Sequence, residues 1–350
     1  MTPMTGRPDG STPAAQGGGL AQGGGLAQAG GVAQAGGVSR TPGRWPTPAG
    51  GPGEVQDALE RYGYLPDEGL ATVVYLALVM RRPLLLEGDA GVGKTEVAKV
   101  IARWTGGELL RIQCYEGIDV AQAVYEWDYS RQLLHLRATE ARAVASGGGV
   151  PAGVEDELYS ERFLVRRPLL AAIAADPAGP APVLLVDEVD RADDDFEAFL
   201  LEVLSEYAIT VPELGTFRAQ VPPIVVITSN RTRDLHDALK RRCLYHWVDH
   251  PSFEREVEII RLKAPGVGVA LAREVAATVE RLRALSLYKP PGVAETIDWA
   301  EALGALGHTR LDEAAVEATL GTVLKYREDA ERARATGIGE LVRAAAERAS

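Results

Sequence analysis

Short apolar runs recur along the middle of the chain, and helical or irregular stretches separate them. The runs are Leu84–Leu86, Leu109–Gln113, Val183–Val186, Ile224–Thr228 and Leu244–Val248. Runs of this length are typical of buried strands, and their spacing is typical of a parallel sheet flanked by helices. The pattern therefore predicts an α/β domain over residues 54–250.

Helical periodicity precedes these runs and replaces them afterwards. Val55–Tyr62 and Gly69–Met80 have helical patterns before the first run, and no strand pattern remains after Ser252. The helices predicted beyond that point are Phe253–Leu262, Leu271–Leu285, Thr296–Leu306, Leu311–Tyr326 and Gly339–Arg348. We expect residues 251–350 to form an all-helical domain.

Residues 1–53 have a different pattern. A six-residue unit that begins Ala-Gln repeats from Ala15 to Val38, and each unit carries about one large apolar residue. So few apolar residues among so many glycines cannot offset the cost of ordering the backbone, so we expect a flexible tail and a Pro/Gly linker. Six-residue periods also occur in β-solenoids, but these copies are too few to stack a core.

The composition of the chain limits the cellular compartment and the classes of binding partner that we expect. The formal charge is −12 and the pI is near 5.1, which disfavours unspecific binding to nucleic acid or to anionic lipid. Cys114 and Cys243 lie far apart and favour reduced intracellular thiols. Gly69–Met80 is too short to span a bilayer, and the first residues lack an apolar signal segment. We expect a soluble cytoplasmic protein without a membrane partner.

A phosphate-loop pattern, G-x-x-x-x-G-K-[ST], covers Gly88–Thr95, between an apolar run and the helical pattern Glu96–Ala102. In this context backbone N–H groups surround phosphate oxygens at the start of a helix. We expect Lys94 to reach the β- and γ-phosphates of ATP and the Thr95 hydroxyl to bind Mg²⁺. The candidate nucleotide-binding residues are Gly88, Asp89, Ala90, Gly91, Val92, Gly93, Lys94, Thr95 and Glu96.

Two adjacent carboxylates end the run Val183–Val186. Asp187 is expected to complete the Mg²⁺ site, and Glu188 is expected to orient and polarise the attacking water. An ordinary acidic loop is the alternative, because Asp190 and further aspartates follow closely.

Asn230 follows the run Ile224–Thr228, where its amide could contact the γ-phosphate and the attacking water. A simple turn after the strand is the alternative. About twelve residues further on, Arg242 precedes the last run and could reach the γ-phosphate of a neighbouring subunit; Arg241 is the weaker candidate. A basic helix end that complements the helix dipole is the alternative there.

These four elements, in this order and with a helical domain behind them, resemble the AAA+ ATPase superfamily. Leu84–Ala98, Gln113–Asp119 and Tyr125–Tyr129 are similar to the MoxR family, in its CoxD-like branch, and the likeness runs from about Tyr64 to Arg332. The resemblance implies an AAA+ phosphate-loop core with a helical lid, ATP hydrolysis with Mg²⁺, and a homo-oligomeric ring such as a hexamer. It also implies that Asn230 is sensor 1 and Arg242 the arginine finger.

The same resemblance implies chaperone-like remodelling, or metal-cofactor maturation, of a client metalloenzyme together with a von Willebrand factor A domain partner. Carbon monoxide dehydrogenase represents the implied class of client. In that family the region of the aromatic stretch Tyr115–Arg131 carries an insert that faces the ring pore; ordinary packing with a surface hairpin is the alternative. Thr210–Arg218 reads as a hairpin just before the sensor strand and is similar to the pre-sensor insert of the family.

The chain departs from the family pattern in two places. The arginine finger lies in Arg241-Arg242-Cys243 rather than in Asp-Arg-Phe, and Pro290–Trp299 has no sensor 2 arginine. A restriction-type AAA+ GTPase or nucleic-acid motor stays open as the alternative, because Ser229–Asp234 is polar and basic and the phosphate loop does not select the base.

Overall fold

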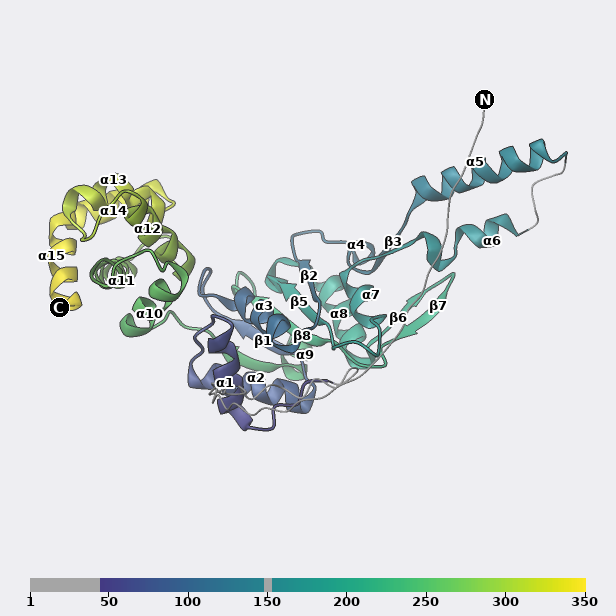
Figure 1. The fold of residues 1–350 in the computed structure, drawn as a ribbon, viewed down its shortest axis with the longest axis horizontal. Helices are drawn as coiled ribbons and strands as arrows, with labels where there is room; N and C mark the ends of the chain where they lie inside the picture. The colour runs from purple at the N-terminus through teal and green to yellow at the C-terminus, as the bar shows by residue number, and fades with distance from the viewer. Residues whose placement is uncertain (1–44, 148–152) are drawn as a thin grey trace, which may run out of the picture. The chain divides into compact units, whose positions relative to one another are not determined.

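The computed structural model describes residues 45–147 and 153–350, and its centre is a five-stranded sheet in the order β2-β5-β8-β1-β9 (Figure 1). All neighbouring strands in this sheet pair in parallel. The strands are β1 (Leu84–Glu87), β2 (Leu109–Gln113), β5 (Val183–Asp187), β8 (Ile224–Ser229) and β9 (Leu244–Trp247). The five predicted strands are confirmed, with ends that differ by at most one residue.

The register of the sheet brings the carboxyl ends of three central strands to one edge. Glu87 of β1 lies beside Ser229 of β8, and Val186 of β5 lies beside Ile227 of the same strand. The segments that follow these strands must therefore meet at that edge. This convergence is a property of parallel pairing rather than of any one motif.

Helices cover both faces of the sheet, because alternate side chains of each central strand enter different apolar clusters. Leu85 packs with helices α7 (Pro168–Ile173) and α8 (Asp194–Glu206), whereas Leu84 and Leu86 pack with α1, α2 and α3. The ranges of these last three are Gly51–Arg61, Glu68–Met80 and Lys94–Thr105. A parallel sheet buried on both faces explains why its strands are almost continuously apolar.

The folded region starts earlier than predicted. Helix α1 begins at Gly51, and Trp45 is buried, with its indole N–H donating to the carbonyl of Leu78 at 2.5 Å. The expectation that the linker extends to residue 53 is therefore wrong for residues 45–53. The repeats of Ala15 to Val38 lie outside the described residues.

Two antiparallel pairs extend from the core. β6 (Ala208–Val211) pairs with β7 (Gly215–Arg218), which confirms the predicted hairpin, and β3 (Tyr125–Trp127) pairs with β4 (Leu164–Arg166). The remaining core helices are α4 (Val120–Val124), α5 (Tyr129–Ala145), α6 (Val154–Leu158) and α9 (Asp237–Arg242), with 3₁₀ turns η1 (Glu161–Phe163) and η2 (Val189–Arg191).

Residues from Phe253 onward are helical and pack around the fully buried Trp299. The helices are α10 (Phe253–Lys263), α11 (Val269–Ala284), α12 (Val293–Ala305), α13 (Glu313–Val323), α14 (Arg327–Thr336) and α15 (Ile338–Ala349). Five were predicted; α14 was not, because it is mostly polar and buries only Asp329 and Ala333. Among the residues described, no helix has the length and apolarity that crossing a membrane requires.

Candidate nucleotide-binding site

The phosphate loop connects β1 to α3 at the carboxyl edge of the sheet. Gly88 opens it with a φ of 153°, and a Cβ at that position would lie 2.3 Å from the carbonyl oxygen of Val248. Only glycine fits this close approach. Helix α3 begins at Lys94, so the loop leads directly into the amino end of a helix, as an anion site requires.

Lys94 is folded back across its own loop. Its buried ammonium donates to the carbonyls of Gly88 and Asp89, both at 2.7 Å. Burial lowers the pKa of Lys94, and the nearby carboxylates of Asp190, Asp89 and Asp187 oppose that shift. The two carbonyls are neutral and do not compensate the charge of this buried ammonium. Pairing with a phosphate would therefore stabilise it.

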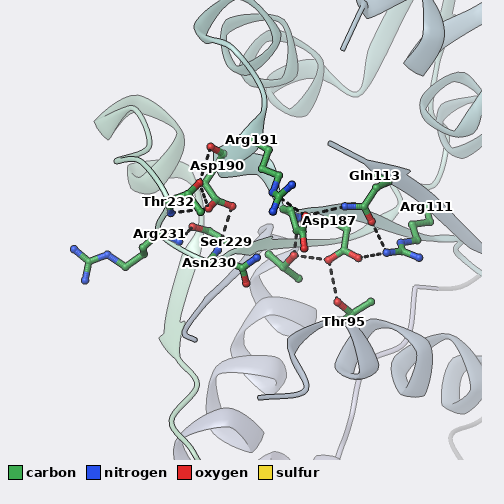
Figure 2. Close-up of polar contacts among 12 residues, drawn as sticks. Thr95, Arg111, Gln113, Asp187, Asp190, Arg191, Ser229, Asn230, Arg231 and Thr232 are labelled. Atoms are coloured by element: carbon green, nitrogen blue, oxygen red, sulfur yellow. Dashed lines mark hydrogen bonds and ion pairs between the residues drawn. The ribbon is translucent and has the colours of Figure 1, made fainter. Parts of the chain in front are cut away.

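Thr95 and Asp187 meet at the same edge, although 92 positions separate them (Figure 2). The Thr95 hydroxyl donates to Asp187 Oδ1 at 2.9 Å, and Thr228 donates to the same oxygen at 2.5 Å. A hydroxyl beside a carboxylate supplies the oxygen donors that Mg²⁺ prefers. The two residues predicted to bind the metal therefore fit it.

Glu188 has an unusual backbone conformation. Its φ of 55° and ψ of 50° are left-handed, a cost of about 1–3 kcal/mol for a residue with a side chain. Its N–H donates to the Thr228 hydroxyl at 2.9 Å, which fixes this turn. One carboxylate oxygen, Oε2, lies 3.2 Å from Gln113 Nε2 and 3.1 Å from Arg191 Nε. The carboxylate is thus held in place beside Asp187.

Asp190 holds the loop that carries Asn230. Its buried carboxylate accepts the N–H of Asn230 at 3.1 Å, and the N–H and hydroxyl of Thr232 at 2.8 and 2.7 Å. Asn230 follows β8 and therefore lies at the same edge of the sheet as Thr95 (Figure 2).

Arg242 lies at the other edge of the sheet. It ends α9 two residues before Leu244, which pairs with Leu84 at the amino end of β1. Its guanidinium donates to the carbonyl of Leu201 at 3.1 Å. The structure therefore brings Lys94, Thr95, Asp187, Glu188 and Asn230 to one edge and leaves Arg242 away from them.

A cavity of about 690 Å³ opens beside the phosphate loop. Apolar side chains such as Val92, Val248 and Ile297 line it, with Tyr64 and His250 among its polar groups. Burial raises the pKa of the Tyr64 phenol and lowers the pKa of His250, so both are neutral near pH 7. Charged side chains such as Arg255 and Lys263 also line the cavity, and its apolar part next to a phosphate site suits a nucleobase.

The amino end of α12 contacts the loop through backbone atoms. The Val293 N–H donates to the carbonyl of Gly91 at 2.9 Å, and a Cβ at Gly292 would lie 2.7 Å from the Cα of Gly91. Glu295 closes this end of the helix by accepting the Gly292 N–H at 3.1 Å. The segment in which no sensor 2 arginine was found thus lies against the phosphate loop.

Sequence reasoning missed several polar residues that support the site: Arg111, Gln113, Asp190 and Thr228. Arg111 and Gln113 are two positions apart on β2, so they share one face of the strand. That alternation of polar residues on an otherwise apolar strand was the available signal. Thr228 lies within an apolar run, and Asp190 only supported the alternative of an ordinary acidic loop.

Comparisons with known proteins bear on the same region. Residues 83–243 match the family model described as AAA domain (dynein-related subfamily). This chain contains an AAA domain. It extends from β1 to the end of α9 and includes every candidate residue of the carboxyl edge. The sheet, this domain and the helical region after it confirm the predicted AAA+ α/β core with a C-terminal helical lid.

The individual similarities are more distant. A RuvB mutant of Thermotoga maritima is 18% identical with a TM-score of 0.44, covering 76% of this chain and 72% of that one. A Cytophaga hutchinsonii protein described as a candidate ATPase is 14% identical with a TM-score of 0.44, covering 85% and 93%. The ATPase family gene 2 protein homolog B of Bos taurus is 40% identical over 65 residues, which are 19% of this chain and only 8% of that protein.

Proposed function

We propose that the AAA domain binds ATP with Mg²⁺ and hydrolyses its γ-phosphate. The observation that carries the proposal is the 2.9 Å contact between Thr95 and Asp187, with Lys94 and Glu188 at the same edge. This contact joins the phosphate loop to the carboxylates at the end of β5. The proposed reaction needs both in one place.

Each residue has a distinct task in this proposal. Lys94 leaves its two carbonyl partners and pairs with the phosphates, while Thr95 and Asp187 hold the metal. Bound Mg²⁺ neutralises charge on the phosphate oxygens. Glu188 orients and polarises the attacking water, and Asn230, held by Asp190, contacts that water or the γ-phosphate. The base occupies the cavity beside Tyr64.

Replacing Glu188 with glutamine tests the hydrolytic step. Glu188→Gln should still bind ATP, because Lys94, Thr95 and Asp187 are intact. Its kcat should fall by about 100-fold or more, because a general base has been removed. Phosphate release and calorimetric ATP binding are the two measurements. Glu202→Gln, at an exposed position on α8, is the matched control; a wild-type kcat for Glu188→Gln would mean that another group orients the water.

Assembly into a ring, such as a hexamer, is the second part of the proposal. Arg242 lies at the edge of the sheet opposite its own phosphate loop. This guanidinium therefore lies away from its own phosphate loop, and we propose that it reaches the γ-phosphate of a second copy. The present contact with a neutral carbonyl of α8 is one that a phosphate would replace.

Arg242→Ala tests this part. We expect kcat to fall about tenfold or more, as for an arginine supplied in trans, with ATP affinity unchanged. Wild-type specific activity should rise with protein concentration, and that rise should be missing from the variant. Mixing Arg242→Ala with Lys94→Ala subunits should restore some activity, because intact arginines then meet intact loops. Absence of rescue, with wild-type activity independent of concentration, would reject the ring.

The resemblance to the CoxD-like branch of MoxR supports a remodelling function. We propose that hydrolysis drives chaperone-like maturation of a cytoplasmic client metalloenzyme, with a von Willebrand factor A domain protein as partner. Affinity capture with Glu188→Gln in ATP tests this, because the variant should hold its partners in the ATP state. Capture of a nuclease subunit together with a preference for GTP would favour the restriction-type alternative.

The structure weakens the support for that alternative. Arg233, one of the basic residues behind it, donates to the carbonyl of Ala192 and pairs with Glu197. Arg231 lies over the ring of Trp247, at 5.7 Å from its centroid. These arginines contact the chain itself, so the segment Ser229–Asp234 offers less positive charge to a nucleic acid than its sequence indicates.

A further inference from the structure

Arg111 contacts both Asp187 and Gln113 at the candidate site (Figure 2). Its Nη2 lies 2.6 Å from Asp187 Oδ2 and also donates to the Gln113 side-chain oxygen. Gln113 in turn donates from Nε2 to Glu188 Oε2 at 3.2 Å. One guanidinium thus contacts the proposed metal carboxylate directly and the proposed water-polarising carboxylate through a single amide.

The direction of the Gln113 amide follows from the chemistry of its neighbours. A guanidinium can only donate hydrogen bonds, so the Gln113 oxygen must face Arg111. The amide NH₂ must then face Glu188, which as a carboxylate only accepts. Arg111 and Glu188 therefore select the same orientation of this amide, and without Arg111 only the contact with Glu188 holds it.

The charge of Arg111 also acts on Asp187. Asp187 Oδ1 already accepts hydrogen bonds from Thr95 and Thr228, so the guanidinium occupies the other oxygen. A positive charge at this distance opposes the approach of a divalent cation to the same carboxylate.

We propose that Arg111 is a positioning residue that fixes Glu188 through Gln113 and weakens the affinity of the Asp187 site for Mg²⁺. The inference rests on the proposed function, because it assumes that Asp187 and Glu188 serve ATP hydrolysis. It goes beyond that function by assigning opposite effects to one side chain. Arg111 raises turnover and lowers metal affinity.

Arg111→Leu should separate these two effects. We expect kcat to fall about tenfold, as for a residue that orients another, with the KM for ATP unchanged. The Mg²⁺ concentration that half-saturates ADP binding should fall by about threefold or more, because a repelling charge has gone. A merely structural role would lower both activity and affinity. Arg111→Lys, which still donates and keeps its charge, should recover most of the kcat and the wild-type Mg²⁺ dependence.

Two further variants complete the test. Gln113→Leu leaves the pair with Asp187 in place, so it should lower kcat and leave the Mg²⁺ dependence unchanged. Arg334→Leu removes a matched ion pair in the lid: Arg334 lies 2.6 Å from Glu317 and its side chain is 47% exposed, against 2.6 Å and 49% for Arg111. It should change neither measurement.

The outcomes distinguish this inference from the proposed function. Unchanged kcat and Mg²⁺ dependence in Arg111→Leu would overturn the inference alone, as would a loss of Mg²⁺ affinity that Arg111→Lys does not rescue. Wild-type protein that binds Mg²⁺ and ADP but releases no phosphate from ATP would overturn the hydrolase proposal, and the Mg²⁺ shift would still decide the effect on Asp187. Wild-type protein that binds no ADP would remove both.

Discussion

The core half and the lid half of the candidate nucleotide site differ in which atoms make their contacts, side-chain atoms or backbone atoms. On the core side, side chains make the contacts: Lys94 to its loop carbonyls, Thr95 to Asp187, and Gln113 to Glu188. Where the amino end of α12 meets the phosphate loop, the backbone makes them, through the Val293 N–H and the close approach of Gly292 to Gly91. Side chains can be identified in a sequence by type and spacing, whereas a backbone contact between two glycines leaves no comparable signal.

The difference also predicts how each half responds to substitution. A side-chain contact is lost when its atoms are removed, so the core half should be sensitive to truncation. A backbone contact survives truncation and fails when atoms are added, so the lid half should be sensitive to a single methyl group. Substitutions at Lys94 and Gly292 test this contrast.

Lys94→Ala should abolish detectable ATP binding. The variant loses the buried ammonium next to the proposed phosphate position, and a hydrogen bond to a charged group is worth about 1.5–3 kcal/mol even before the phosphate charges are counted. Calorimetry with ATP and Mg²⁺ measures the loss, and circular dichroism checks that the fold is intact. Retained affinity would show that the core half does not depend on this side chain.

Gly292→Ala should have a smaller effect, of a different kind. Its Cβ would lie 2.7 Å from the Cα of Gly91 and 2.8 Å from the Glu295 carboxylate, so α12 must move away from the loop. We expect kcat to fall about three- to tenfold, with ATP binding weakened less than in Lys94→Ala, because about 1 kcal/mol of contact is lost. Hydrogen exchange at α12 should become faster.

Gly321→Ala is the matched control for this variant. Gly321 lies in α13 of the same helical domain, and a Cβ there would meet no atom within 4 Å. The substitution should leave kcat unchanged and raise stability by about 0.5–1 kcal/mol, since alanine favours a helix interior. Equal kinetic losses in the two variants would mean that the contact of Gly292 with Gly91 has no special role.

The core of the fold could be predicted from sequence because buried parallel strands are apolar throughout. Three of these strands end in the polar residues Glu87, Asp187 and Ser229. The change from apolar to polar residues made the carboxyl edge predictable as well. Helix α5 was not predicted: only Gln132 and Ala143 are buried along its 17 residues, so it carries no apolar stripe. Trp45 was missed for the opposite reason, because a single buried aromatic side chain among prolines and glycines has no periodicity.

Within the site, prediction from the sequence reached the residues of local motifs, such as Thr95 and Asp187, which lie in contact. It failed for Arg111 and Asp190, whose tasks depend on neighbours far away in the chain: Arg111 contacts a residue 76 positions later, and Asp190 contacts a loop about 40 positions later. Roles that arise from cross-strand neighbours require the strand order, and the strand order is not contained in any local motif.

The position of Lys94 has a consequence for the end of the proposed catalytic cycle. The two carbonyls that it contacts, at 2.7 Å each, are intramolecular competitors for the same ammonium that a nucleotide needs. Because both carbonyls belong to the loop itself, they can accept hydrogen bonds from the Lys94 ammonium again when the product leaves. Such competition lowers the net affinity for every nucleotide by the same amount, and it favours exchange of spent product for fresh substrate over tight retention of either.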